Sequence, residues 1–461
     1  MEPVRSWWSP PRSAQNEAAL VAKAAYVLRG NDNGTMVTAS PRLYPHMWSW
    51  DTAFISIGLA HLDIRRAAAE LETLLAAQWS DGMLPHIVFS DDAHYFPGPD
   101  RWGTAVAAQK PDHVQTSGIC QPPVHAIALR TILDAARRAP RPDQVAVERF
   151  AARAWPALYA WHRWLSEYRR DQDSGLISIV HGWESGMDNS PRWDGPYEAV
   201  EPGPDLPPYV RRDLRAVGDA GQRPTDLEYD RYLWLVEEMR RVRYDPAEVV
   251  RTSSFLVGDV FITAVYALSS AVLAELGEEL GRPAEEVDYL LECARRARAA
   301  VASSCDSAGF AQDLDLRTGQ WLHSRTVAGF APLLCGGLDR AGERILLSTM
   351  DGEDWSGHPG LVAAVPPSVS PNESDFSSSQ YWRGPQWPVV AWLFGWAFAR
   401  RGWPKRAAML RSEGLRLVGD GAFGEYYHPF TGEPLGSSGQ SWTAAVTIDW
   451  VCAQTASHRP T

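Results

Sequence analysis

Acidic residues set among tryptophans and glycines are the first feature of this sequence that could do chemistry. The segment HGWESGMDNSPRWD (181–194) places three carboxylates beside two tryptophans, with Asp188 near its middle. An apolar aromatic surface removes water from a carboxylic acid, which disfavours the charged form and raises its pKa. Asp188 can therefore keep its proton near neutral pH and act as a general acid. Alternatively, DNSP is a turn in which Asp188 accepts local backbone N–H bonds.

A second acidic residue lies in FGEYYHPFTGEP (423–434), where Glu425 follows a glycine and is surrounded by aromatic residues. In this setting a carboxylate can hold a water molecule against a sugar ring. A glutamate in a surface turn is the alternative. Two carboxyl groups on opposite sides of a glycosidic bond are the minimum for its hydrolysis, one to protonate the leaving oxygen and one to act on the nucleophilic side. The stereochemical outcome does not follow from this pairing alone.

Tryptophan is unusually frequent, with 21 residues in a chain of 461. An indole can stack on the C–H face of a sugar and donate a hydrogen bond at its edge, although a large core can also use it as filler. Three segments gather such side chains with polar ones, namely MWSWDT (47–52), DGMLPH (81–86) and QYWRGPQWP (380–388). In the first, Asp51 is expected either at a helix N-cap or against a sugar hydroxyl. The clusters favour sugar binding.

Helical periodicity dominates the elements that must position these residues. Helices are expected at 18–28, 52–60, 65–77, 124–137, 144–168, 226–243, 254–276, 284–303, 340–349, 388–401, 405–417 and 443–455. Strand-like alternation is short, as at 176–180. Helices in hairpin order without a parallel-sheet pattern predict helix packed on helix, and hence an all-α fold. The sequence shows no convincing domain boundary, so we expect one catalytic domain over residues 1–461.

Two long segments, 171–225 and 351–386, interrupt the helical pattern. Loops of this length in a compact chain are usually functional or disordered. Disordered linkers are poor in aromatic residues, whereas both segments contain them. We therefore expect these segments to form loops over the active site.

Charge and composition exclude several classes of protein. The net charge of −12 and the lack of a basic run argue against nucleic acid as a partner. The N-terminal segment MEPVRSWWSPPRS lacks a continuous apolar stretch, and no segment matches the roughly 18 uncharged apolar residues of a membrane span. The five cysteines are far apart and lack CxxC spacing, so reduced thiols are expected. These features predict a cytoplasmic protein that does not bind membranes.

Sequence motifs of other enzyme classes are not found. There is no P-loop, no GxGxxG before a helix, no HExxH and no GxSxG. No cofactor and no metal are therefore expected, and the predicted partner is a small glycoside. The sequence leaves a homo-oligomer open.

Taken together, the motifs resemble glycoside hydrolase family 63, and within it the bacterial glucosylglycerate and mannosylglycerate hydrolases. The resemblance is carried by MWSWDTAF, DGMLPH, GWESGMDNSPRWD, RPTDLEYDRYLWLV, QYWRGPQWPV and FGEYYHPFTGEP, spread in order over nearly the whole chain. It implies an (α/α)6 toroid and hydrolysis with inversion. It also implies that Asp188 is the general acid and Glu425 the general base.

The same resemblance implies the residues that bind substrate. Those expected at the sugar subsite are Trp50, Asp51, His86, Gln121, Tyr381, Trp382, Trp387 and Gln440. Arg223 and Tyr229, from RPTDLEYDRY, are expected to hold a substrate carboxylate, since a guanidinium matches a carboxylate bidentately. The alternative for Arg223 is a solvated residue at the start of a helix, and a lone histidine such as His86 is often structural.

The function implied is hydrolysis of a small α-glycoside, glucosylglycerate or mannosylglycerate, to the sugar and glycerate. One alternative is a trehalase-like enzyme or another α-glucosidase on the same fold. Another, from a different class, is a sugar-binding protein without catalysis. Substrate tests separate the first alternative, because Arg223 should matter only for an acidic aglycone.

Overall fold

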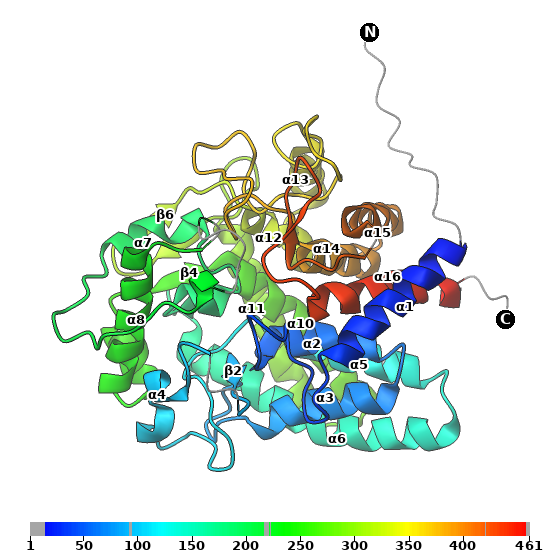
Figure 1. Cartoon of the computed structure of the whole chain (residues 1–461), viewed down its shortest axis with the longest axis horizontal. Helices are drawn as coiled ribbons and strands as arrows, with labels where there is room; N and C mark the ends of the chain where they lie inside the picture. The colour runs from blue at the N-terminus through cyan, green and yellow to red at the C-terminus, as the bar shows by residue number, and fades with distance from the viewer. Residues whose placement is uncertain (1–13, 92–94, 216–220, 222, 420, 458–461) are drawn as a thin grey trace, which may run out of the picture.

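A closed ring of helices organises the chain (Figure 1). The computed structural model describes residues 14–91, 95–215, 221, 223–419 and 421–457. The segment MEPVRSWWSPPRS, and residues 216–220 and 222 of the predicted 171–225 loop, lie outside the described residues. Within these ranges, the inner ring consists of α2 (Ser49–Leu59), α5 (His125–Ala136), α10 (Val260–Glu279), α12 (Ala331–Cys335), α14 (Pro388–Arg400) and α16 (Ser441–Ser457). Each inner helix contacts the next, and α16 contacts α2, which closes the ring.

An outer layer of helices covers this ring, one for each inner helix. Its members, in the order of their inner partners, are α3 (Ile64–Ala76), α6 (Arg141–Trp164), α11 (Ala284–Ser303), α13 (Arg340–Asp351), α15 (Pro404–Val418) and α1 (Ala14–Gly30). In Figure 1, α1 lies beside α16, so the two ends of the described chain meet. This arrangement is the predicted (α/α)6 toroid.

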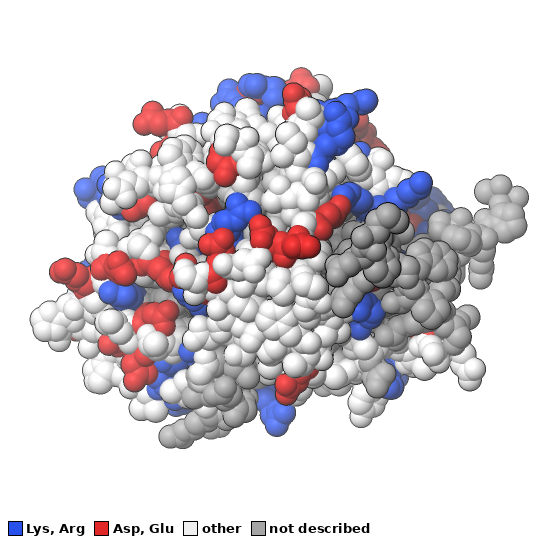
Figure 2. Space-filling model, turned by 90° about the horizontal axis from the view of Figure 1, so that it is seen from above, with Lys and Arg blue, Asp and Glu red and all other residues white. Residues whose placement is uncertain are grey.

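The apolar content of the helices explains which of them are inside. All 11 residues of α2 are buried, whereas α13 buries only Leu346, Leu347 and Met350. A helix that is apolar all round needs neighbours on every side, and an amphipathic helix needs them on one side only. By length and composition α10 could cross a membrane, but 89% of its most apolar stretch is buried inside the protein. On the face in Figure 2, acidic and basic side chains are interspersed.

The predicted helix 254–276 begins later than expected. Residues Val257–Asp259 form strand β4, and the Asp259 carboxylate accepts hydrogen bonds from the backbone N–H groups of Phe261 and Ile262. Asp259 is thus the N-cap that starts α10 at Val260. The other predicted helices are present with ends shifted by a few residues, and α6 continues into a π-helical turn at Leu165–Arg169.

Short elements, mostly outside the predicted helices, complete the fold. Outside the double ring lie the short helices α4 (Pro99–Trp102), α7 (Asp194–Glu198) and α9 (Pro246–Thr252) and the longer helix α8 (Asp226–Arg241). Turns of 3₁₀ helix lie at Thr104–Val106, Gly182–Ser185, Pro191–Trp193, Asp213–Arg215 and Val327–Phe330.

Small antiparallel sheets anchor the loops that join the helices. They are β1 (Met47–Trp48) with β2 (Ile87–Val88), then β3 (Ile177–Ile179), β4, β5 (Asp313–Asp315) and β6 (Gln320–Leu322) in that order, and β7 (Tyr426–Tyr427) with β8 (Pro434–Leu435). The strand predicted at 176–180 is confirmed as β3. Each sheet is next to a motif singled out above, because β1 leads into α2, β3 leads into the 181–194 loop, and Glu425 precedes β7.

Candidate active site

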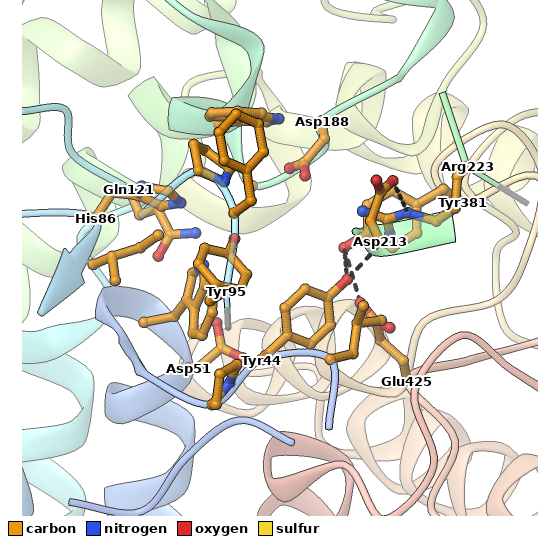
Figure 3. Close-up of a pocket in the computed structure, with 18 of the residues that line it drawn as sticks. Tyr44, Asp51, His86, Tyr95, Gln121, Asp188, Asp213, Arg223, Tyr381 and Glu425 are labelled. Carbon is orange, nitrogen blue, oxygen red and sulfur yellow. Dashed lines mark hydrogen bonds and ion pairs between the residues drawn. The ribbon is translucent and has the colours of Figure 1, made fainter. Parts of the chain in front are cut away.

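A cavity of about 150 Å³ opens at the N-terminal ends of α2 and α16 (Figure 3). It is smaller than the roughly 300–1,000 Å³ of pockets for drug-sized ligands, so a small ligand suits it. Ten of the predicted site residues line it, namely Trp50, Asp51, His86, Gln121, Asp188, Arg223, Tyr229, Tyr381, Glu425 and Gln440. Asp188 and Glu425, far apart in the sequence, therefore share one cavity.

Only one of the three carboxylates in the 181–194 loop faces this cavity. The Glu184 carboxylate is buried and pairs with the Arg169 guanidinium at 2.8 and 2.9 Å. The Asp194 carboxylate pairs with Arg383 at 2.7 and 2.9 Å. Asp188 lies on a turn and lines the cavity. The structure thus gives Glu184 and Asp194 structural roles and leaves Asp188 for a ligand.

A buried ion cluster fixes the turn that carries Asp188. Nη1 of Arg192 lies 3.2 Å from Oδ1 of Asp259 and 3.1 Å from both carboxylate oxygens of Asp313. The Asp313 carboxylate also accepts the backbone N–H of Val260 at 2.9 Å, at the start of α10. All three charged side chains are buried. Arg192 therefore connects the 181–194 loop to the start of α10 and to the sheet that contains β4 and β5.

Burial controls the protonation of the acidic residues in the cavity. It raises the pKa of Asp188 to about 7, while the charge of Arg223 lowers this pKa and the charge of Glu425 raises it. Burial raises the pKa of Asp51 well above its usual range, and the charges of Glu425 and Asp188 add to this effect. Asp188 is therefore close to its midpoint near neutral pH, and burial favours the protonated form of Asp51.

Glu425 is held between two hydrogen-bond donors. The Tyr381 hydroxyl donates to its Oε1 at 2.8 Å, and the backbone N–H of Ser437 donates to its Oε2 at 2.9 Å. Burial raises the pKa of Glu425, and the Ser437 N–H, the charge of Arg223 and the Tyr381 hydroxyl oppose this rise. Tyr381 itself has a φ of 21°, a conformation that costs a non-glycine residue about 1–3 kcal/mol and is common at functional sites.

Aromatic and amide groups line the buried part of the cavity. The Gln121 side chain accepts the backbone N–H of Trp50 at 3.2 Å, which fixes the start of α2. Gly186, with a φ of +70°, packs so closely on Trp50 that an added Cβ would lie 2.8 Å from the indole. Within the described part of the chain, His86 Nδ1 and Gln440 Oε1 are buried without a hydrogen-bond partner. Such orphaned polar atoms in a cavity wall suit the hydroxyl groups of a ligand.

Two predicted sugar-binding residues lie outside the cavity wall. Trp382 and Trp387 are stacked on each other, with ring centroids 3.6 Å apart. Trp382 contacts Trp50, and Trp387 contacts Tyr381, so both support lining residues from behind. The alternative that Asp51 is a helix N-cap is wrong, because the N-cap of α2 is Trp48 and Asp51 is the third helical residue.

Basic residues gather at the mouth of the cavity. Arg42 and Arg212 are exposed lining residues, while Arg223 is largely buried and donates from Nε to the Asp213 carboxylate at 3.2 Å. Arg211 pairs bidentately with the same carboxylate at 2.7 and 2.8 Å. Arg223 is thus an ordered residue rather than a solvated one.

An aromatic and acidic set that sequence reasoning missed completes the mouth. Tyr44, Tyr95 and Asp213 line the cavity with Tyr229. Tyr44 lies three residues before the MWSWDT motif, and this nearness is the signal that could have found it. Asp213 and Tyr95 have no comparable neighbour in the sequence.

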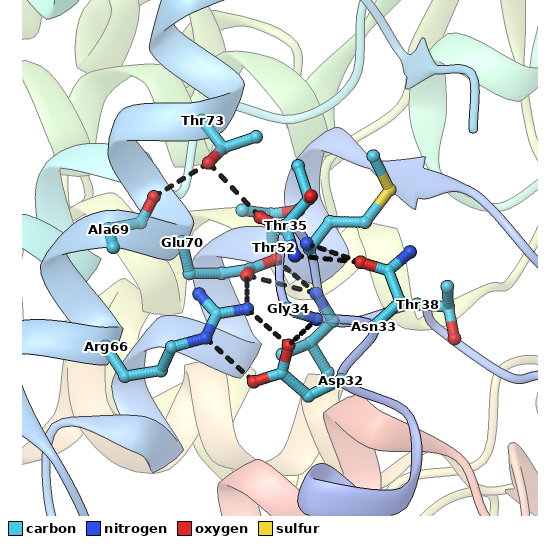
Figure 4. Close-up of polar contacts among 12 residues, drawn as sticks. Asp32, Asn33, Gly34, Thr35, Thr38, Thr52, Arg66, Ala69, Glu70 and Thr73 are labelled. Atoms are coloured by element: carbon cyan, nitrogen blue, oxygen red, sulfur yellow. Dashed lines mark hydrogen bonds and ion pairs between the residues drawn. The ribbon is translucent and has the colours of Figure 1, made fainter. Parts of the chain in front are cut away.

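The segment that carries Tyr44 is fixed by buried polar contacts (Figure 4). Both carboxylate oxygens of Glu70 accept the backbone N–H of Val37 at 3.1 Å. Arg66 bridges Glu70 and Asp32 at 2.8 Å. These contacts join α3 to the chain that leads into β1.

The fold and this site define the class of protein. A ring of helices holds two buried carboxyl groups in one small aromatic-walled cavity, with the environment of Asp188 favouring a proton and that of Glu425 supplying donors to the ionised form. Paired carboxyl groups in different environments are the requirement for acid–base cleavage of a glycosidic bond. The protein is a glycoside hydrolase.

Comparison with known proteins identifies the family. The model described as "Mannosylglycerate hydrolase MGH1-like glycoside hydrolase domain" matches residues 44–443. The chain is 55% identical to the glucosylglycerate hydrolase of Mycolicibacterium hassiacum over 435 residues, which cover 94% of this chain and 97% of that protein. It is 39% identical to the mannosylglycerate hydrolase of Thermus thermophilus over 431 residues, covering 93% and 99%. The chain belongs to the MGH1-like glycoside hydrolases of family 63.

Solved structures agree with this assignment. The family 63 mannosylglycerate hydrolase from Thermus thermophilus, in complex with Tris and D-glycerate, matches with a TM-score of 0.84 and 39% identity over 94% of this chain and 99% of that chain. A neutral trehalase from Saccharomyces cerevisiae matches with a TM-score of 0.52 and 13% identity over 93% of this chain and 79% of that chain. The second likeness concerns the fold alone.

Proposed function

We propose that this chain hydrolyses a glycoside of glycerate, with glucosylglycerate as the first candidate substrate and mannosylglycerate as the second, and that it inverts the anomeric configuration. The name of the relative that is 55% identical supports the first substrate, and the name of the relative that is 39% identical supports the second.

The polarity of the cavity is the observation that carries the proposal. Its buried part contains the carboxylate of Glu425, whose negative charge would repel an anion. Its mouth contains the guanidinium groups of Arg42, Arg212 and Arg223. A neutral sugar therefore suits the buried part, and an aglycone with a carboxylate suits the mouth, where Arg223 can bind it through charge-assisted hydrogen bonds.

In the proposed reaction, Asp188 donates its proton to the glycosidic oxygen as the bond to the anomeric carbon breaks. Glu425 takes a proton from the water that attacks the same carbon from the opposite face. The raised pKa of Asp188, about 7, supports the first role. The donors on both oxygens of Glu425 support the second, since they favour its ionised form.

The first experiment identifies the substrate and the stereochemistry. Purified protein is incubated with glucosylglycerate, mannosylglycerate, trehalose and kojibiose, and the released sugar and its first-formed anomer are followed by NMR. We expect the α-glycosides of glycerate to release the β-anomer first. Preference for trehalose, or first release of the α-anomer, would contradict the proposal.

The second experiment tests the residues. Asp188→Asn and Glu425→Gln should each lower kcat by about 10²–10⁴-fold, the usual contribution of a general acid or base. Glu433→Gln is the matched control, because Glu433 is exposed in the same hairpin as Glu425. Arg223→Gln should raise KM for glycerate glycosides only. Unchanged turnover in the Asp188 or Glu425 variant would refute these roles.

The proposal extends to the whole chain as one catalytic domain acting on a small molecule in a reducing compartment such as the cytoplasm. Support for one domain comes from the ring, whose closure uses helices from α1 to α16. Support for the compartment comes from the five cysteines, which all lie in the described part of the chain and form no disulfide.

A further inference from the structure

A continuous chain of hydrogen bonds connects the mouth of the cavity to Glu425 (Figure 3). Nη1 of Arg223 donates to the Tyr44 hydroxyl at 3.3 Å, and the hydroxyls of Tyr44 and Tyr381 are 3.2 Å apart. The Tyr381 hydroxyl then donates to Oε1 of Glu425 at 2.8 Å. Four segments that are remote in sequence contribute one member each, so the chain exists only in the folded ring.

The chemistry of its two ends fixes the direction of this chain. A guanidinium can only donate hydrogen bonds, and an ionised carboxylate can only accept them. Tyr44 must therefore accept from Arg223 and donate to Tyr381, which donates to Glu425. Hydrogen bonds aligned in this way polarise one another. The positive charge of Arg223 thus acts on Glu425 through two hydroxyl groups as well as through space.

The arginine at the outer end is oriented by its neighbours. Asp213 accepts from its Nε at 3.2 Å, and Arg211 in turn fixes the Asp213 carboxylate. The guanidinium carbon of Arg223 lies 5.2 Å from the centre of the Tyr381 ring. Because Nε donates to Asp213, the Nη atoms are available to donate hydrogen bonds to Tyr44 and to a ligand.

We propose that Tyr44 and Tyr381 form a relay through which an anionic aglycone bound at Arg223 strengthens Glu425 as a base. The inference rests on the proposed function, because it takes Arg223 as the aglycone site and Glu425 as the base. In the free enzyme, the relay opposes the rise that burial causes in the pKa of Glu425. A carboxylate bound at Arg223 accepts the hydrogen bonds of the guanidinium and offsets its positive charge. The relay then weakens, and Glu425 attracts the proton of the attacking water more strongly. Tyr44 is then a positioning residue.

The charges around the cavity define the expected pH dependence. Glu425 and Asp188 affect the pKa of each other. The other groups that interact electrostatically with one or both of them are Asp51 on α2, Arg223 before α8, and the hydroxyls of Tyr44, Tyr95, Tyr197, Tyr232 and Tyr381. The charge of Arg223 lowers the pKa of both Asp188 and Glu425. An anion bound at Arg223 therefore raises both pKa values.

The test compares pH profiles for a charged and a neutral aglycone. The kcat/KM profile reports the free enzyme, and the kcat profile reports the enzyme–substrate complex. With glucosylglycerate, both limbs of the kcat profile should lie about one pH unit above those of the kcat/KM profile, the lower end of shifts caused by a nearby charge. With glucosylglycerol, whose aglycone is neutral, the two profiles should coincide.

Variants separate the relay from the direct effect of charge. Tyr44→Phe should shrink the displacement of the acidic limb, which reports Glu425, to the part that Arg223 exerts through space. It should keep the displacement of the alkaline limb, because Arg223 acts on Asp188 through space alone. Tyr381→Phe removes the hydroxyl that donates directly to Glu425 and should have the same effect on the two limbs. Tyr95→Phe is the control, since Tyr95 lines the same mouth but lies outside the relay; it should keep both displacements.

A binding measurement makes the test independent of turnover. Carboxyl-labelled glutamate, with Glu425 assigned through Glu425→Gln, gives its pKa by NMR with D-glycerate or with glycerol. D-glycerate should raise this pKa in the wild type and raise it less in Tyr44→Phe, where only the through-space effect of Arg223 remains. If the wild type hydrolyses neither glucosylglycerate nor mannosylglycerate, the proposed function fails. If it hydrolyses either one, but D-glycerate leaves the pKa unchanged or Tyr44→Phe responds like the wild type, the relay alone is overturned.

Discussion

Replacement of Arg192 by methionine tests how the fold holds Asp188 in place. The Arg192 guanidinium is 2% exposed and faces two buried carboxylates, those of Asp259 and Asp313. Burial raises the pKa of Asp313 to about 6, and the charge of Arg192 opposes this rise. Without Arg192, two acidic groups would share an apolar space with no cation beside them.

The expected loss of stability is large for a single substitution. Removing one partner of a buried ion pair costs about 3–5 kcal/mol, because the remaining charge stays desolvated. The loss should depend on pH with a definite sign. The folded-state pKa of Asp313 lies above its unfolded value of 3.8 and would rise further in the variant. Stability is then retained at low pH and lost as pH rises through 6 and above, so the deficit should be greater at pH 8 than at pH 5.

Urea unfolding at pH 5 and pH 8 measures this effect. Arg295→Met is the control, because the Arg295 pair with Glu292 is exposed on α11 and should leave the midpoint almost unchanged. The double variant Arg192→Met with Asp313→Asn should recover part of the loss. A deficit no greater than that of the control, or one that shrinks as pH rises, would refute the reasoning.

Three further predictions concern the site. The kcat/KM for glucosylglycerate should fall as pH rises through about 7, because Asp188 must keep its proton; initial rates from pH 5 to 9 check this, and a profile flat above pH 7 contradicts it. Gly186→Ala should cost about 1–3 kcal/mol in thermal unfolding and raise KM, since its Cβ would displace Trp50. Asp213→Asn should raise KM for glucosylglycerate by about tenfold, an effect of roughly 1.4 kcal/mol on Arg223, while trehalose kinetics stay the same.

The fold was largely predictable because helical periodicity is a local property of the sequence. The exceptions have local causes of their own. Ala331–Cys335 is an inner helix too short to show a period, and Asp259 caps α10 after a strand that continues the same apolar run. The closure of the ring by α16 on α2 depends on contacts between distant segments, which the family resemblance supplied.

The site was predictable where a residue lies in a distinctive motif. Asp188 and Glu425 stand in such motifs and share the cavity, whereas Trp382 and Trp387 stand in one and lie behind its wall. Asp213 could not be found in this way, because its partner Arg223 comes from another segment and an aspartate in a loop has many uses. Residue types indicate the chemistry, and only the folded chain decides which groups meet.

The interface between α16 and α2 has a consequence for how the protein is made. The α16 helix packs against both α1 and α2. The first helices to leave the ribosome therefore cannot complete their packing until the last one has been synthesised. During synthesis the apolar side of α2 that α16 will cover stays open to water or to a chaperone. The part of the cavity wall formed by Trp50 on α2 and Trp442 on α16 is assembled in the last step. A chain stopped before α16 would contain the proposed acid and base and still lack Trp442, which lines the cavity.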